Sequence, residues 1–326
     1  MDAAIELRNV TKTFGQTTAV KDLNLTVPNG GLYGFIGPNG AGKTTTIRLI
    51  LSIFLPDSGE ISVLGHSSAL RARSRIGYLP EERGVYRKMR VGAFLKYIAG
   101  LKGVKDLNID KTIRASLERV GLGGTERRRC EELSKGMLQK VQLLAAVIHK
   151  PDLLILDEPF SGLDPVSTRQ LRDLVLEEHR RGATILFSTH VMPQAEEICQ
   201  HVIMVHRGRK VLDEALDSIR SQYDPRTIVF NPLDSGADLS PIARLPGVES
   251  VESDVSGYKI FLAADTNPAD AMRRIIETAT PARLELSRPR LEDIFINLVA
   301  TAADTPEDRN KLRADLENAG DGEAAS

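Results

Sequence analysis

The stretch at residues 32–45, LYGFIGPNGAGKTT, decides the fold of this chain. Residues 32–36 form a short apolar run typical of a buried strand, and they lead directly into a glycine-rich loop. Residues 44–54 then have a helical pattern, which the turn cluster at 56–59 ends. A strand, a glycine-rich loop and a helix in this order favour a parallel sheet with helices packed against it.

The glycine-rich loop has the spacing G-x-x-x-x-G-K-[ST] of a phosphate-binding loop. Its glycines allow backbone N–H groups to point at phosphate oxygens, and the following helix adds partial positive charge from its N-terminus. We expect Lys43 to reach the β- and γ-phosphates of a nucleotide and the Thr44 hydroxyl to bind Mg²⁺. The predicted phosphate-binding residues are Gly37, Pro38, Asn39, Gly40, Ala41, Gly42, Lys43, Thr44 and Thr45.

A second acidic element follows a buried strand pattern at residues 153–156, where Asp157 and Glu158 stand side by side. Because ligands bind at the carboxyl ends of the strands in a parallel sheet, we expect Asp157 beside the phosphate loop, where it orients Mg²⁺. Glu158 is placed to accept a proton from an attacking water.

The pattern along the chain predicts several regions. Residues between about 88 and 150 are mainly helical in pattern, whereas strands and helices alternate after them, which indicates a mainly parallel sheet with a helical insertion. Beyond residues 223–225, short strand and helix patterns predict a small α+β domain. The predicted regions are 1–220, a nucleotide-binding domain with its helical subdomain at about 88–150, then 221–300, an accessory domain, and 301–326, a disordered acid-rich tail.

Composition limits the classes of partner. The formal net charge of −1 argues against a protein that binds nucleic acid through bulk positive charge. Cys130 and Cys199 lack the spacing of a metal site or a disulfide framework, which fits a reducing compartment. No apolar run approaches the roughly 18 residues of a membrane helix, and the N-terminus does not resemble a signal peptide. If the protein acts at a membrane, another chain must supply the span.

The motif LSKGM at residues 133–137 narrows the family, because it resembles the LSGGQ signature of ATP-binding cassette (ABC) ATPases. Residues 161–164, SGLD, resemble the D-loop of that family. His190 resembles its switch histidine, and Phe14 resembles the aromatic residue that stacks on adenine. The resemblance covers about residues 1–215, and it implies a P-loop ABC cassette with a mixed sheet and an inserted helical subdomain.

The resemblance also implies roles for these residues. Ser134, Lys135, Gly136 and Asp164 would face the ATP of a second ATPase subunit, so that a homodimer encloses two nucleotides. Ser134 can cap its own helix, whose N-terminus with Gly136 suits a γ-phosphate. His190 would position the attacking water, and stacking on Phe14 is worth roughly 1–3 kcal/mol.

Three positions depart from the family pattern, and one of them is Met137, which stands where glutamine is usual. Glu81 stands where a glutamine is usual; its carboxylate can offer oxygen to Mg²⁺ but adds negative charge near the phosphates. Lys135 stands where glycine is usual. Its ammonium can approach the partner's γ-phosphate or point to solvent, and we favour solvent.

The segment at residues 77–84 and the motif LEDIF at residues 291–295 resemble ATPase subunits of ABC-2-type exporters for sodium and drug efflux. This branch implies ATP hydrolysis coupled to transport, a separately encoded integral-membrane permease, and a cytoplasmic position on the inner face of the membrane. No nucleic-acid partner is expected. The alternative is a soluble non-transport ABC ATPase that acts on ribosomes or DNA, although only one phosphate loop and no sustained heptads are present. An importer subunit is a third option, and nothing in the sequence identifies a transported substrate.

Overall fold

The structure, a computed structural model, describes residues 3–82, 84–222, 226–234, 239–254, 257–263, 265–287 and 290–301. Contacts between residues divide the chain into two compact units. The first comprises Met1–Leu216 together with Phe295–Ser326, and the second comprises Asp217–Ile294. The predicted tail at 301–326 lies outside the described residues except for Thr301.

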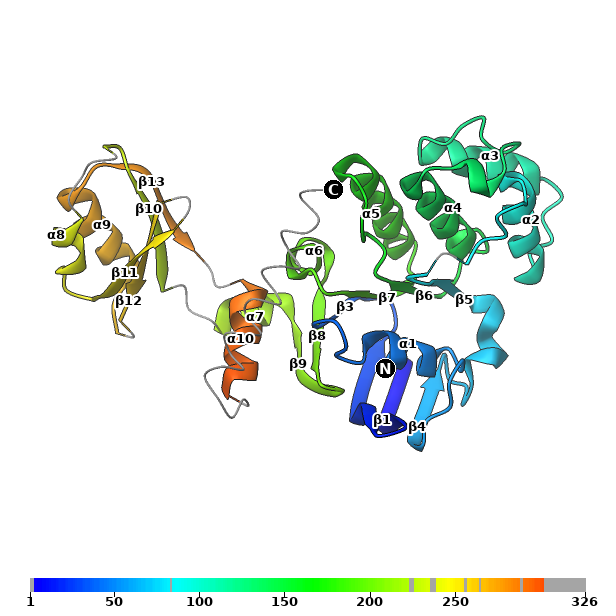
Figure 1. Cartoon of the computed structure of the whole chain (residues 1–326), viewed down its shortest axis with the longest axis horizontal. Coiled ribbons are helices and arrows are strands. Elements are labelled where there is room, and N and C mark those ends of the chain that lie inside the picture. Colours follow the sequence, from blue (N-terminus) through cyan, green and yellow to red (C-terminus); the bar gives the residue numbers. More distant parts are fainter. Residues whose placement is uncertain are drawn as a thin grey trace. The chain divides into compact units, whose positions relative to one another are not determined.

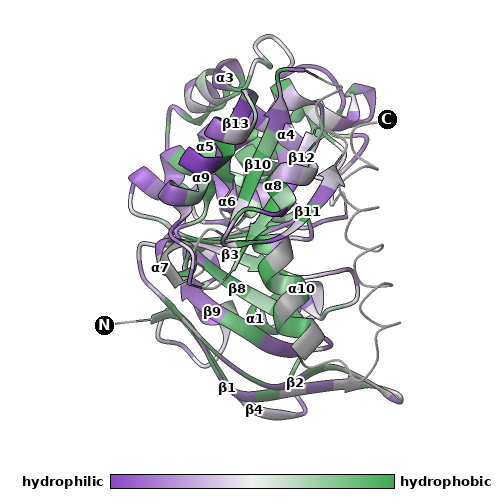
Figure 2. Ribbon diagram, turned by 90° about the vertical axis from the view of Figure 1, so that its left-hand side faces the viewer, coloured by the Kyte–Doolittle hydropathy of each residue, from purple (hydrophilic) through white to green (hydrophobic). Residues whose placement is uncertain are grey.

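A six-stranded sheet forms the centre of the first unit and consists of β3 (Leu32–Ile36), β5 (Ile76–Leu79), β6 (Leu153–Asp157), β7 (Thr184–Thr189), β8 (His201–His206) and β9 (Arg209–Ala215). The strand order is β5-β6-β7-β3-β8-β9, and all neighbours are parallel except β8 and β9. Every residue of β3, β6 and β7 is buried, as expected for parallel strands covered on both faces. In Figure 2, β8 is drawn largely in the hydrophobic colour.

The second sheet of this unit is antiparallel and contains β1 (Ala3–Phe14), β2 (Thr17–Pro28) and β4 (Ser58–Val63) in the order β2-β1-β4. Leu23, Leu25 and Val27 of β2 are buried and alternate with exposed residues, as in an antiparallel strand with one buried face. Helix α1 (Lys43–Ile50) and this sheet lie on one side of the six-stranded sheet, whereas α5 (Pro165–Arg180) and α6 (Met192–Ile198) lie on the other (Figure 1). One hydrophobic core joins the two sheets through α1.

The predicted helical subdomain contains α2 (Val91–Leu101), α3 (Ile109–Arg119) and α4 (Lys135–Val147). Short 3₁₀ segments at Ala69–Arg75 and Cys130–Glu132 precede α2 and α4. Helix α4 contacts α2 and α3 of the subdomain as well as β5 and α5 of the sheet layer. It therefore connects the inserted helices to β5, the strand that precedes Glu81, and to α5.

Two local features differ from the sequence-based expectation. The helix predicted over residues 44–54 ends at Ile50, because Ser52 adopts a left-handed conformation with φ 57°. The N–H groups of Ile53 and Phe54 then both donate to the Arg48 carbonyl, at 2.9 and 3.1 Å. Strand β9 was not predicted; it pairs with β8 across a turn at Arg207-Gly208, where both residues have positive φ.

The second unit is a small α+β domain, as predicted. It contains β10 (Thr227–Pro232), α8 (Ser240–Ala243), β11 (Val248–Asp254), β12 (Gly257–Leu262), α9 (Pro268–Thr278) and β13 (Pro281–Ser287). The strands are all antiparallel, in the order β11-β12-β10-β13. This βαββαβ succession is the ferredoxin-like arrangement. Ile228, Phe230 and Ile260 from the strands and Ile275 from α9 are among its buried core residues.

Two helices lie at the boundaries of the second unit, α7 (Leu216–Gln222) and α10 (Leu291–Thr301). From Phe295 onward, α10 belongs to the first unit. The ring of Phe295 is fully buried, and its centroid lies 5.9 Å from that of His206 on β8. Within the described residues, none of the helices has the length and apolar character needed to cross a membrane.

Candidate nucleotide-binding site

The phosphate loop connects β3 to α1, and two of its glycines are required by close approach to other backbone segments. A Cβ on Gly37 would lie 2.3 Å from the Val205 carbonyl oxygen, and one on Gly42 would lie 2.4 Å from the Ala19 carbonyl oxygen. Gly42 also has φ 102°, in the left-handed region that favours glycine. Larger residues would displace the loop from β8 and β2.

Lys43 is buried at the base of the loop. Its Nζ donates to the Gly37 carbonyl at 2.7 Å and to the Pro38 carbonyl at 3.3 Å, and it lies 3.5 Å from Oε1 of Glu158. Burial lowers the pKa of Lys43, although the neighbouring carboxylates of Glu158 and Asp157 oppose this effect. The cation is thus held within the loop.

Asp157 ends β6 and is completely buried. Its Oδ1 accepts hydrogen bonds from the hydroxyls of Thr44, at 3.4 Å, and Ser188. Burial raises the pKa of Asp157, whereas these two hydrogen bonds lower it. Its Oδ2 is buried and has no hydrogen-bond partner among the described residues. An unshared carboxylate oxygen beside a threonine hydroxyl is a donor set that suits Mg²⁺.

Glu158 follows directly and has φ 48°, a conformation that is unfavourable for residues with a Cβ. Its N–H donates to Oγ of Ser188 at 3.1 Å and to the Ser188 carbonyl at 3.2 Å. Its Oε1 lies 3.0 Å from Nδ1 of His190 as well as near Lys43. Backbone bonds to Ser188 and two side-chain partners therefore hold this carboxylate in place.

Ser188 was not among the predicted site residues. It lies opposite Asp157 in the β6–β7 pairing and binds both acidic residues. The sequence contains only a weak indication that Ser188 belongs to the site, since it is a serine at the end of a strand pattern, two residues before His190.

Glu81 follows β5 and is exposed, yet it lies within electrostatic range of the other carboxylates. Partial burial and the charges of Asp157 and Glu158 raise its pKa, while Lys43 and His190 lower it. Negative charge therefore accumulates at this edge of the sheet. Among the described residues, no group of three or more His, Cys, Asp or Glu side chains is arranged to hold a metal ion, so a cation here would need oxygens from the nucleotide as well.

The remaining predicted residues on α4 and α5 form a second group. Ser134 caps α4 by accepting from the Met137 N–H at 3.3 Å, and Asp164 caps α5 by accepting from the Ser167 N–H at 2.9 Å. A Cβ on Gly136 would lie 3.1 Å from the Ser167 hydroxyl, so the two helix N-termini lie close together. Lys135 is exposed, and its ammonium lies over Gly162.

Phe14 stands at the end of β1 and is 45% exposed. Its ring makes an edge contact with Phe54, at a centroid distance of 5.4 Å, and the Lys12 ammonium lies 5.5 Å from its centroid. An exposed, laterally supported ring is suited to stacking on a base.

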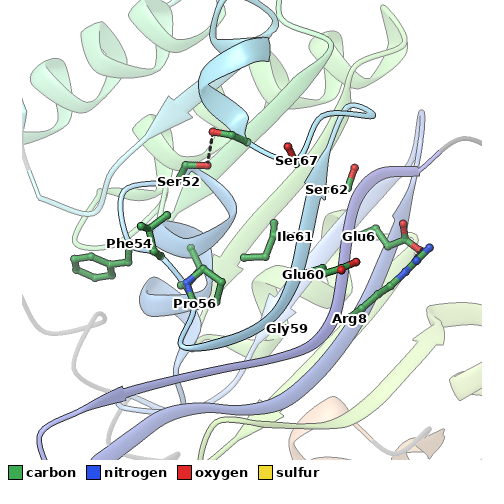
Figure 3. Close-up of a pocket in the computed structure, with 13 residues that line it drawn as sticks. Glu6, Arg8, Ser52, Phe54, Pro56, Gly59, Glu60, Ile61, Ser62 and Ser67 are labelled. Atoms are coloured by element: carbon green, nitrogen blue, oxygen red, sulfur yellow. Dashed lines mark hydrogen bonds and ion pairs between the residues drawn. The ribbon is translucent and has the colours of Figure 1, made fainter.

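A surface cavity of about 530 Å³ lies between β1, β4 and the segment after α1 (Figure 3). Its lining includes serines, apolar side chains and three charged residues, Glu6, Arg8 and Glu60. The Arg8 guanidinium is paired with Glu6 at 2.7 Å. Because none of the predicted site residues lines it, this cavity is separate from the phosphate loop.

Comparisons with known proteins agree with this geometry. Residues 20–161 match the profile of the family described as ABC transporter, and residues 215–299 match the C-terminal domain of ATP-binding proteins like DrrA1-3. The uncharacterized ABC transporter ATP-binding protein YhaQ of Bacillus subtilis (strain 168) is 38% identical over 295 residues, which cover 90% of this chain and 98% of the relative. The chain belongs to the ABC transporter ATP-binding proteins.

A second relative and a solved structure are also similar to this ABC transporter ATP-binding protein. The Nod factor export ATP-binding protein I of Burkholderia lata is 34% identical over 309 residues, covering 91% of this chain and 97% of that protein. A solved structure of an ATP binding subunit of an ABC transporter superposes with a TM-score of 0.63 and 31% identity, over 68% of this chain and 93% of that one. The predicted P-loop ABC cassette is confirmed. As a member of this family the chain binds ATP and hydrolyses it to power transport, together with separate membrane permease components.

Proposed function

We propose that this chain is the ATPase subunit of an exporter and that two copies close on two ATP molecules. The direction of transport is supported by similarity to proteins named for Nod factor export. A role in transport is also supported by a further relative, the bacitracin transport ATP-binding protein BcrA of Enterococcus faecalis, which is 36% identical over 216 residues. The match of residues 215–299 to a DrrA1-3-like C-terminal domain supports the same branch of the family.

The observation that carries the hydrolytic assignment is the position of the Glu158 carboxylate. It contacts His190 on one side and Lys43 on the other, in a backbone conformation that two bonds to Ser188 hold. In this proposal Glu158 accepts the proton of the attacking water, His190 positions that water, and Lys43 binds the β- and γ-phosphates. The loop residues and Phe14 hold the rest of the nucleotide.

Asp157 and Thr44 would hold Mg²⁺, because one buried oxygen of Asp157 has no partner in the described part of the chain and the Thr44 hydroxyl is adjacent. Glu81 would contribute a further oxygen from the end of β5. Bound Mg²⁺ would neutralise charge on the β- and γ-phosphates and offset the crowding of carboxylates at this edge.

Closure would bring Ser134, Gly136 and Asp164 of one subunit to the ATP of a second copy. The segment from Glu81 to Arg90 would pass this motion to a permease, which would hold the chain at the inner face of the membrane. Named relatives that are transporter subunits favour this role over an ATPase acting on ribosomes or DNA.

Two experiments test the proposal. The Glu158→Gln variant should sediment as a dimer with ATP and Mg²⁺ and as a monomer without nucleotide, because it closes but does not turn over. A monomer under both conditions would contradict the closure mechanism.

A polytopic membrane protein should co-purify with the tagged chain from detergent, and recovery of ribosomes or DNA instead would support the alternative.

A further inference from the structure

Helix α4 makes a series of contacts with the segment that follows Glu158, residues 159–167, which we call the post-glutamate segment. The side-chain amide of Gln139 donates to the Pro159 carbonyl at 3.3 Å, in a buried position. At the start of the helix, Gly136 packs against Ser167 and Leu163. Between these points lies the contact of Lys135 with Gly162. The helix therefore meets this segment at its beginning, middle and end.

The contact of Lys135 is specific in shape. Gly162 has φ 63°, and a Cβ built on it would overlap the Lys135 ammonium. The close approach therefore depends on glycine at this position. Lys135 is the first residue of α4, so its stem is anchored to the helix and only the side chain extends to the post-glutamate segment.

The first turn of the post-glutamate segment, from Glu158 to Leu163, contains two long backbone hydrogen bonds. The Ser161 N–H donates to the Glu158 carbonyl at 3.3 Å, and the Leu163 N–H donates to the Phe160 carbonyl at 3.4 Å. Both distances exceed the usual range for N–H···O bonds. Contacts from outside the turn, including the Lys135 ammonium, must therefore contribute to its order. Because the turn starts at Glu158, its order bears on the position of that carboxylate.

We infer that Lys135 is a positioning residue for hydrolysis, whose ammonium fixes the turn at Gly162 and thereby holds Glu158 in its productive place. The inference rests on the proposed role of Glu158 as the base. It also gives a physical route between the two sites of a closed pair. Ser134 and Lys135 lie at the same end of α4. Contact of Ser134 with the partner's nucleotide would therefore change the position of the subunit's own Glu158.

A direct contact between Lys135 and the partner's γ-phosphate makes a different prediction. Loss of such a contact would weaken the apparent affinity for ATP and so raise KM. Loss of a positioning contact should instead lower kcat and leave KM nearly unchanged, because the ground-state nucleotide contacts remain intact.

The test uses the full chain with Lys135→Met, which keeps the length of the stem, and Lys135→Arg, which keeps the charge. Lys105→Met is the matched control, since Lys105 is an exposed lysine of the same subdomain. Steady-state ATP hydrolysis gives kcat and KM. Hydrogen exchange of the Ser161 and Leu163 amides, measured without nucleotide, reports the order of the turn independently of turnover.

For Lys135→Met we expect kcat to fall about threefold to tenfold with KM within about twofold of wild type, and the two amides to exchange at least about threefold faster. Lys135→Arg should restore both, and Lys105→Met should change neither. Unchanged kcat, unchanged exchange, or a raised KM with normal kcat would each overturn the inference. If Glu158→Gln kept wild-type turnover, the proposed base would fail instead, and the exchange rates would still report whether Lys135 orders the turn.

Discussion

The two groups of predicted site residues differ in how their polar atoms are used. In the first group, around Lys43, Asp157, Glu158 and His190, side chains from three segments contact one another in a buried setting. In the second, Ser134 and Asp164 each cap their own helix. The first group has a buried oxygen on Asp157 that no described residue pairs with, whereas the capping oxygens of the second group already accept hydrogen bonds.

This difference indicates a division of roles. The first group can bind phosphates and perform proton transfer with its own side chains. The second offers mainly the N-termini of α4 and α5, which favour an anion but need one supplied from outside. Substitutions in the first group should therefore weaken nucleotide binding or turnover through contacts within one chain. Those in the second group should leave nucleotide binding by a single chain unchanged and should lower turnover only when two chains meet.

The largest effect should come from the centre of the first group. Glu158→Gln should lower turnover by about 10²–10³-fold, because the amide cannot accept the proton of the attacking water. ATP affinity should stay within about threefold of wild type, since Gln preserves the shape of the side chain. Phosphate release at saturating ATP and nucleotide titration measure the two quantities. Wild-type hydrolysis would remove Glu158 from the role of base.

Lys43→Ala should weaken ATP binding by about 10- to 100-fold, because it removes a charge-assisted contact to the phosphates. The effect should appear with a single chain at low protein concentration, measured by titration with a fluorescent nucleotide. Lys105→Ala serves as the control for loss of a positive charge. Equal affinity in the Lys43 and Lys105 variants would contradict the assignment of the loop.

A smaller effect is expected in the second group. Ser134→Ala should cost about 1 kcal/mol in the free energy of unfolding, through loss of the α4 cap. It should also lower turnover without weakening ATP binding to the single chain. Asn267→Ala removes a comparable cap on α9, where the Asn267 side chain accepts from the Ala269 N–H, and should change stability alone. If Ser134→Ala weakened single-chain binding as much as Lys43→Ala, the division between the groups would not hold.

The smallest effect concerns Glu81. Its pKa is raised in the folded chain, first by partial burial and then by Asp157 and Glu158, so its ionised form disfavours the folded state. This destabilisation is present at pH values above the pKa of Glu81 in the folded chain. It disappears at pH values below the pKa of Glu81 in the unfolded chain. Without nucleotide, Glu81→Gln should therefore raise Tm by about 1–2 °C at pH 8, and the difference should vanish near pH 4. Thermal unfolding at both pH values measures this. A larger difference in Tm at pH 4 than at pH 8 would contradict the expected direction of the pKa shift of Glu81.

Much of the first unit could be predicted from sequence because its central strands are continuous apolar runs that end in functional residues. The runs before Gly37 and Asp157 are examples. Strand β9 could not be predicted in the same way. Its sequence RKVLDEA mixes charged and apolar residues, and the Arg207-Gly208 turn lacks the Asn-Gly or Asp-Gly signal of a tight hairpin.

The missed part of the site has a similar cause. Ser188 acquires its position only from the register between β6 and β7, which places it opposite Asp157. Register is a property of two strands that are distant in sequence, so the local pattern around Ser188 contains no sign of it. The contact of Lys135 could not be predicted for the same reason. Lys135 begins α4, whereas its neighbour Gly162 lies in the segment after β6, and only the fold brings the two together.

The burial of Phe295 against His206 has a consequence for synthesis of the protein. A ribosome completes β8 long before it reaches α10, because the whole of the second unit lies between them in sequence. At about 5–20 residues per second, the nascent first unit waits for several seconds with an apolar site uncovered beside His206. A chain ending at Leu216 would leave that site permanently open to aggregation or to chaperones, even though every predicted catalytic residue had already been made.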